Sequence, residues 1–91
     1  MNSILQKDKR CWFCPCETGL EKHHVFAGVA NRKLSEKYGL WVWLCHEHHT
    51  GKDGAQYDPE KNRQLKRYAQ TCFEMEYGHA LWMDVFRKNY L

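Results

Sequence analysis

The sequence predicts a small α+β fold that is stabilised by a structural zinc ion and extended by C-terminal helices. The chain has 91 residues, a length at which disulfides or metals often supplement a modest hydrophobic core. It carries five cysteines and six histidines, and two pairs of them have the spacing of metal ligands. Two short β-forming stretches precede a long segment with helical periodicity. We expect residues 1–91 to form one domain, with a metal-bound core over about 9–54 and helices over about 58–90.

The composition argues against two classes of protein. The odd number of cysteines and the absence of an apolar N-terminal signal argue against a secreted disulfide framework, so metal binding is the better interpretation. No stretch approaches the roughly 20 apolar residues of a membrane span, so we expect a cytoplasmic protein with no membrane partner. The formal net charge of +3 is compatible with a nucleic-acid partner but does not identify one.

The first ligand pair is Cys11-x-x-Cys14, the spacing of a zinc knuckle, in which a tight turn directs two thiolates at one ion. A redox pair is the competing interpretation, but no βαβ pattern follows it. Cys16 offers an alternative partner, because it lies two residues after Cys14. We favour Cys11 with Cys14, since a two-residue gap suits the knuckle and Pro15 stiffens the chain after it.

The segment Leu20–Phe26 alternates loosely between polar and apolar side chains and is predicted to be a short strand. It contains the adjacent His23 and His24. Successive side chains of a strand point to opposite faces, so we expect these histidines to have different roles. A lone histidine is usually an ordinary surface or core residue, but two in succession near a zinc knuckle indicate a functional site.

A short helix is predicted over Asn31–Tyr38, and Gly39 takes the position just past its end. The apolar run Leu40–Leu44 is strongly β-forming and is predicted to be the second strand. Trp41 and Trp43 share one face of this strand. We expect them to pack in the core rather than to stack on bases.

The second strand leads directly into Cys45-x-x-His48-His49, which we expect to begin a short helix. At about 3.6 residues per turn, Cys45 and His48 lie almost above one another, whereas His49 is rotated by about 100°. One metal is therefore not expected to bind both histidines. Cys45 and His48 complete a Cys3His zinc set with Cys11 and Cys14. His49 is left for a second site.

The last third of the chain is predicted to be helical, with Asp58 as N-cap and Pro59 at the first helical position. Gly78 is expected to end this helix, and a shorter amphipathic helix follows it. The long helix has an apolar stripe that faces a core, formed by Leu65, Tyr68, Ala69, Cys72 and Phe73. Its basic residues are either a phosphate-facing surface or, by default, a solvated face: Lys61, Arg63, Lys66 and Arg67.

Taken in order, these motifs resemble the HNH endonuclease family, in its small phage or prophage type. The resemblance runs from Cys11 to Lys52, just under half of the chain. It rests on Cys11-x2-Cys14, His23-His24-Val25, Asn31 and Cys45-x2-His48-His49-x2-Lys52. It implies a ββα-metal core built on a treble-clef zinc site.

The resemblance also implies a role for each candidate residue. His24 would be the general base, and His23 and His49 would bind a divalent catalytic ion, Mg²⁺ or Mn²⁺. Asn31 would brace the loop between the strands and help to hold the base, although it lies farther from the zinc ligands than is usual in the family. Asp53 could complete the ligands of the catalytic metal.

The chemistry of these residues is consistent with such roles. Phosphodiester hydrolysis needs a deprotonated water, and a neutral imidazole with a pKa of about 6.5 is suited to accept that proton. An ion held by two histidines keeps positions open for water and phosphate oxygens, as a catalytic metal requires. Arg32 and Lys52 are candidates for phosphate contacts that give affinity without sequence preference.

The leading hypothesis is therefore an endonuclease that hydrolyses DNA in a bacterial host cell, with other phage proteins as further partners. Two alternatives stay open. One is a non-catalytic zinc module that binds nucleic acid or protein, and the other is an HNH-like scaffold that has lost activity and serves phage packaging or recombination. The set of His23, His24 and His49 discriminates the endonuclease from the zinc module, because a plain zinc module does not need these histidines.

Overall fold

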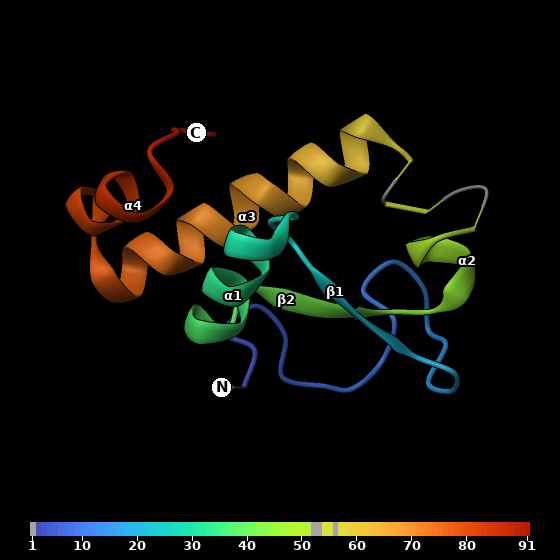
Figure 1. Ribbon diagram of the computed structural model, residues 1–91. Helices are drawn as coiled ribbons and strands as arrows, with labels where there is room; N and C mark the ends of the chain where they lie inside the picture. The colour runs from blue at the N-terminus through green and yellow to red at the C-terminus, as the bar shows by residue number, and fades with distance from the viewer. Residues whose placement is uncertain (1, 52–53, 56) are drawn as a thin grey trace.

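The computed structural model describes residues 2–51, 54–55 and 57–91 and forms a small α+β fold (Figure 1). Its elements in chain order are β1 (Glu21–His24), α1 (Val29–Tyr38), β2 (Trp41–Leu44), α2 (His46–His49), α3 (Pro59–Tyr77) and α4 (His79–Phe86). The predicted order of strands and helices is confirmed. The strands are shorter than predicted, and α1 begins at Val29 rather than Asn31.

The two strands pair antiparallel, with Glu21 opposite Leu44 and His24 opposite Trp41. Because α1 lies in the connection between the strands and α2 follows β2 directly, the unit is ββα-like with an inserted helix. The rings of Trp41 and Trp43 meet edge to face on β2, with centroids 5.3 Å apart. Trp41 is buried, which agrees with a packing role.

Gly39 joins α1 to β2 and also makes room for the N-terminal segment. It adopts the left-handed conformation with φ 70°, and its N–H donates to the carbonyl of Ser35. A Cβ at this position would lie 2.3 Å from the backbone oxygen of Asn2, so a side chain would displace that segment. The N–H of Ile4 donates to the carbonyl of Gly39 at 2.9 Å. Glycine is therefore required here for two reasons.

The long helix α3 begins and ends as the sequence predicts. The carboxylate of Asp58 accepts hydrogen bonds from the N–H groups of Glu60 and Lys61, and Pro59 is the first helical residue. The helix ends at Gly78, and α4 folds back beside it (Figure 1).

The apolar stripe of α3 packs against the strands and α4. Leu65, Ala69 and Phe73 are buried in one core with Trp82 of α4, whose ring lies 5.2 Å from that of Phe73. Tyr68, also predicted on the stripe, is 41% exposed and packs at its edge. None of the helices within the described residues is both long enough and apolar enough to span a membrane.

Candidate metal centre and histidine cavity

The structure brings the four predicted zinc ligands to one point. The ligand atoms of Cys11, Cys14, Cys45 and His48 all lie within 4.8 Å of one another. Sγ of Cys45 is 3.2 Å from Nδ1 of His48, and Sγ of Cys14 is 3.7 Å from Sγ of Cys45. A tetrahedral ion with metal–sulfur bonds of about 2.3 Å separates neighbouring sulfurs by about 3.7 Å. The cluster is therefore consistent with a structural zinc ion.

Local backbone structure presents these ligands. The knuckle closes through a hydrogen bond of 2.8 Å from the N–H of Cys11 to the carbonyl of Cys16. The thiol of Cys16 points instead at the carbonyl of Thr18, at 3.3 Å, and lies outside the cluster. Cys45 is the N-cap of α2, with extended backbone angles, rather than part of its first turn as predicted. His48 reaches the same point from inside the helix.

The thiols of the cluster are close enough to influence one another. The backbone N–H of Cys16 lowers the pKa of the Cys14 thiol, but desolvation and the neighbouring Cys11 and Cys45 outweigh it and raise that pKa to about 11. Thiolates at these separations repel one another, and a bound cation removes this repulsion. The donor set thus fits zinc in its chemistry as well as in its geometry.

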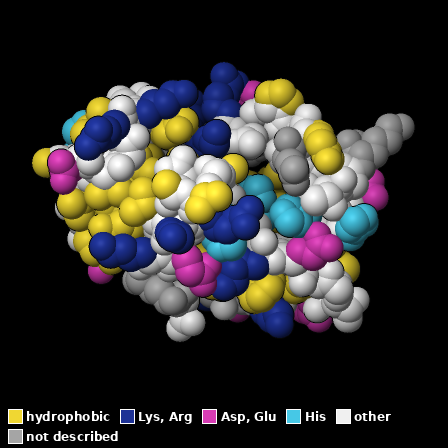
Figure 2. All heavy atoms as spheres, in the orientation of Figure 1, with side chains coloured by type: hydrophobic (Ala, Val, Ile, Leu, Met, Phe, Trp, Pro, Cys, Tyr) yellow, Lys and Arg dark blue, Asp and Glu magenta, His cyan; other side chains and the backbone are white. Residues whose placement is uncertain are grey.

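A second group of predicted residues lines a cavity of about 450 Å³, which we call the histidine cavity. It lies between β1, α1, α2 and α3, and Figure 2 shows histidines gathered on this face beside lysine and arginine side chains. Its lining includes His23, His24, Arg32, His49, Asn62 and Lys66. The last two come from α3, and Lys66 is one of the basic residues for which the sequence allows a phosphate-facing surface.

His23 and His49 approach one another in this cavity, with ring centroids 5.2 Å apart. Nδ1 of His49 donates to the carboxylate of Glu21 at 2.7 Å, so Nε2 is the ring nitrogen that is left for another partner. Such carboxylate–histidine pairs orient imidazoles that bind metals. Burial, together with the charges of His49 and His24, lowers the pKa of His23 to about 4. His23 is therefore neutral at pH 7, the form in which an imidazole binds a metal.

His24 is held by a different carboxylate. Its Nε2 donates to Glu36 of α1 at 2.7 Å, and Glu36 also accepts a hydrogen bond from Lys22 at 3.0 Å. These two hydrogen bonds lower the pKa of Glu36, so the carboxylate stays ionised. Glu36 thus engages Nε2 of His24, and Nδ1 is the ring nitrogen that is left for another partner. The alternation of β1 gives the adjacent histidines separate partners, as expected from strand geometry.

Asn31 lies on the exposed first turn of α1, outside the residues that line the histidine cavity. The side chain that binds His24 is that of Glu36, not that of an asparagine. Arg32, the next residue, does line the cavity. Two further sequence-based candidates, Lys52 and Asp53, fall outside the described residues.

Sequence reasoning missed the two carboxylates that support the histidines. Glu21 precedes His23 by two residues and therefore shares its strand face, so the period-two rule could have found it. Glu36 follows His24 by 12 residues, and only the packing of α1 against β1 brings the two together. No local signal could have identified that pair.

Comparisons with known proteins assign no family, since no family model, curated protein or solved structure matches the chain. Fold and site define a class: a small ββα-like unit that carries a Cys3His cluster and is followed by C-terminal helices. The resemblance to the HNH endonuclease family rests on the motifs within that unit.

Proposed function

We propose that this protein is a metal-dependent HNH-type endonuclease that hydrolyses phosphodiester bonds in DNA. One observation carries the proposal: His23, His24 and His49 line a single cavity beside a Cys3His cluster. A zinc module that only binds a partner has no need for this second group of histidines, two of which are supported by carboxylates.

In this proposal His23 and His49 hold a divalent cation, Mg²⁺ or Mn²⁺. Both are suited to do so, because His23 is neutral at pH 7 and Glu21 engages Nδ1 of His49, so that Nε2 is the nitrogen that can face the cation. Glu21 fixes the orientation of His49. The cation supplies Lewis-acid stabilisation to the scissile phosphate and the departing 3′ oxygen.

His24 is the proposed general base. Its Nδ1 takes the proton from the attacking water, while Glu36 retains the proton on Nε2 and stabilises the imidazolium that forms. General-base catalysis by a positioned side chain contributes about 10² to 10⁴ in rate. Glu36 is thus a positioning residue that acts through His24.

In this proposal the structural zinc ion positions the helix that carries His49. His48 belongs to the Cys3His cluster, and His49 follows it directly in α2. An ion at the cluster therefore fixes the short helix, and with it the imidazole of His49, relative to β1. Arg32 on α1 and Lys66 on α3 lie on the cavity wall and are the proposed contacts to the phosphates.

Incubation of supercoiled plasmid with the zinc-loaded protein and Mg²⁺ or Mn²⁺ tests the proposal. Wild-type protein should cut the plasmid and His24→Ala should not. His79→Ala is a matched control, because His79 is an exposed histidine on α4 that pairs with Glu74. Intact plasmid with the wild-type protein would overturn the proposal and favour the zinc-binding interaction module instead.

A further inference from the structure

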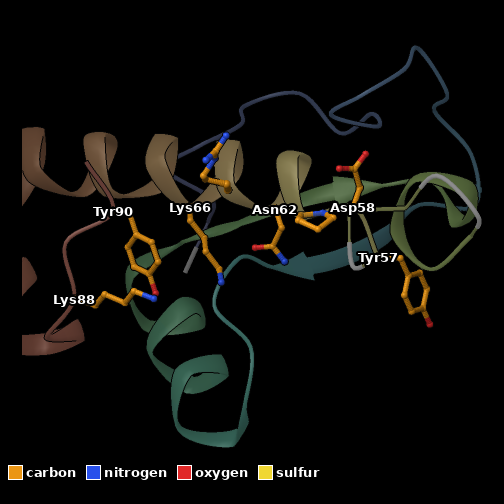
Figure 3. A pocket seen from close by; sticks show the side chains of 8 residues that line it. Tyr57, Asp58, Asn62, Lys66, Lys88 and Tyr90 are labelled. Atoms are coloured by element: carbon orange, nitrogen blue, oxygen red, sulfur yellow. The ribbon is translucent and has the colours of Figure 1, made fainter.

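A second cavity, of about 460 Å³, lies between the beginning of α3 and the C-terminal tail, residues 87–91. Figure 3 shows Asn62 and Lys66 extending from α3 on the same side as Lys88 and Tyr90 from the tail. Asn62 and Lys66 also line the histidine cavity. The two cavities therefore share a wall. We call the second one the basic groove.

Two lysine side chains of the basic groove lie beside the ring of Tyr90. Nζ of Lys66 and Nζ of Lys88 lie 5.6 Å and 5.2 Å from the centroid of the Tyr90 ring. Among residues 2–51, 54–55 and 57–91, neither lysine forms an ion pair with a carboxylate. Desolvation and the charge of Lys88 lower the pKa of Lys66. An anion placed between the two lysines would relieve that repulsion.

The acidic residue of the groove does not neutralise them. The carboxylate of Asp58 accepts the N–H groups of Glu60 and Lys61 as the cap of α3, at 3.0 Å and 3.3 Å. It points away from Lys66 in Figure 3. The groove thus presents a positive potential to its ligand.

The C-terminal tail that forms one side of the groove is held by part-buried hydrogen bonds to side chains of α3 and α4. The fully buried side chain of Gln70 accepts from the N–H of Tyr90 and donates to the side chain of Asn89, both at 2.7 Å. Nε1 of Trp82 donates to the carbonyl of Lys88 at 2.8 Å. The backbone at Lys88 and Tyr90 is therefore fixed beside the groove, which lowers the entropic cost of binding a ligand there.

From these observations we infer that the basic groove binds a backbone phosphate of the nucleic acid whose scissile phosphate lies in the histidine cavity. Lys66 and Lys88 supply the charge, and the amide of Asn62 supplies a neutral donor. A polyanionic strand fits better than a free anion, because Asn62 and Lys66 border both cavities and one strand can occupy both. The inference rests on the proposed function for its substrate class, nucleic acid.

Binding of a fluorescent 20-base-pair duplex, followed by anisotropy without added divalent cation, tests the inference apart from cleavage. Lys66→Gln and Lys88→Gln should each weaken binding by about 3- to 10-fold and lower the slope of log K against log salt by about 1. Lys66→Arg and Lys88→Arg should restore most of the affinity. Lys33→Gln, on the exposed face of α1 and outside both sets of lining residues, is the matched control and should bind as the wild type does.

Circular dichroism and zinc content first establish that each variant is folded. Equal affinities and salt slopes for the double variant Lys66→Gln/Lys88→Gln and for Lys33→Gln would overturn the inference. It would also be wrong if the double variant lost affinity for inorganic phosphate in calorimetry while duplex binding stayed unchanged.

The failure of this inference and that of the proposed function are distinguishable. If Lys66 and Lys88 are needed to bind the duplex but plasmid stays intact with Mg²⁺, the inference about the basic groove stands and the proposed endonuclease activity is wrong. If the protein cuts plasmid but its duplex affinity does not depend on these lysines, the proposed endonuclease activity stands and the inference about the basic groove is wrong.

Discussion

His48 and His49 are adjacent in α2, yet their imidazoles serve different sites. Nδ1 of His48 lies 3.2 Å from the sulfur of Cys45 in the Cys3His cluster, whereas the ring of His49 lies 5.2 Å from that of His23 in the histidine cavity. The rotation of about 100° between successive helical residues accounts for this separation. A single turn of helix thus connects a structural site to a candidate catalytic one.

The first prediction concerns the zinc ion. Elemental analysis of dialysed protein should find about one zinc per chain, and a strong chelator should unfold the protein, because metal affinity in such sites is folding free energy. Cys14→Ser should lose the zinc. Cys16→Ser is the control and should keep it, since its thiol lies outside the cluster. Loss of zinc from Cys16→Ser and its retention in Cys14→Ser would show that the other pair is the ligand pair.

The second prediction concerns the hydrogen bond between Glu36 and His24. Glu36→Gln keeps the size of the side chain but removes the charge that stabilises the imidazolium, so we expect kcat to fall by about 10- to 100-fold. Duplex affinity and zinc content should not change, which separates a positioning role from a structural one. Glu17→Gln, at an exposed site, is the matched control. An unchanged kcat for Glu36→Gln would mean that the pair does not support catalysis.

Glu21 leads to a third prediction, because its carboxylate holds Nδ1 of His49. Glu21→Gln should weaken binding of the catalytic cation by about 10- to 100-fold, as is typical when the support of a metal-binding histidine is lost. Titration of Mn²⁺ into the zinc-loaded protein measures this effect. Zinc content should stay at the wild-type value. An unchanged Mn²⁺ affinity of Glu21→Gln would show that His49 is not a ligand of the catalytic cation.

The fourth prediction follows from the lowered pKa of His23, which is about 4 against an ordinary value of 6.5. Between these two values the unfolded chain binds a proton that the folded chain does not, so the free energy of unfolding falls as the pH drops from about 6.5 towards 4. His23→Asn cannot take up this proton and should lose less stability than the wild type between pH 7 and pH 5. Urea denaturation at both pH values measures the difference. The zinc ligands are the same in both proteins, so any contribution of zinc release to the pH dependence cancels. Equal losses of the free energy of unfolding would therefore contradict the prediction.

The parts of the fold that the sequence predicted are those set by short-range geometry. Cys11 and Cys14 share one turn, Asp58 and Pro59 start a helix, and Gly39 ends one. Each of these signals depends on a few neighbouring residues.

The parts that could not be predicted depend on packing between distant elements. The pairing of Glu36 with His24 requires α1 to lie against β1, and the placement of Lys88 requires the buried Gln70 to hold the C-terminal tail. Gln70 lies on a helix whose apolar stripe gave no reason to expect a buried amide. The Cys3His cluster could thus be predicted from local spacing, whereas the pairing of Glu36 with His24 and the placement of Lys88 could not.

The dependence of plasmid cleavage on Mg²⁺ concentration tests the central claim most directly, when it is measured for the wild type, His23→Ala and His24→Ala. If His23 binds the cation and His24 is the general base, His23→Ala should need more Mg²⁺ and regain much of its activity. His24→Ala should stay slower by about 10² to 10⁴ at every concentration. Cleavage by both variants at the wild-type rate and Mg²⁺ concentration would contradict the account, because neither histidine would then take part in catalysis.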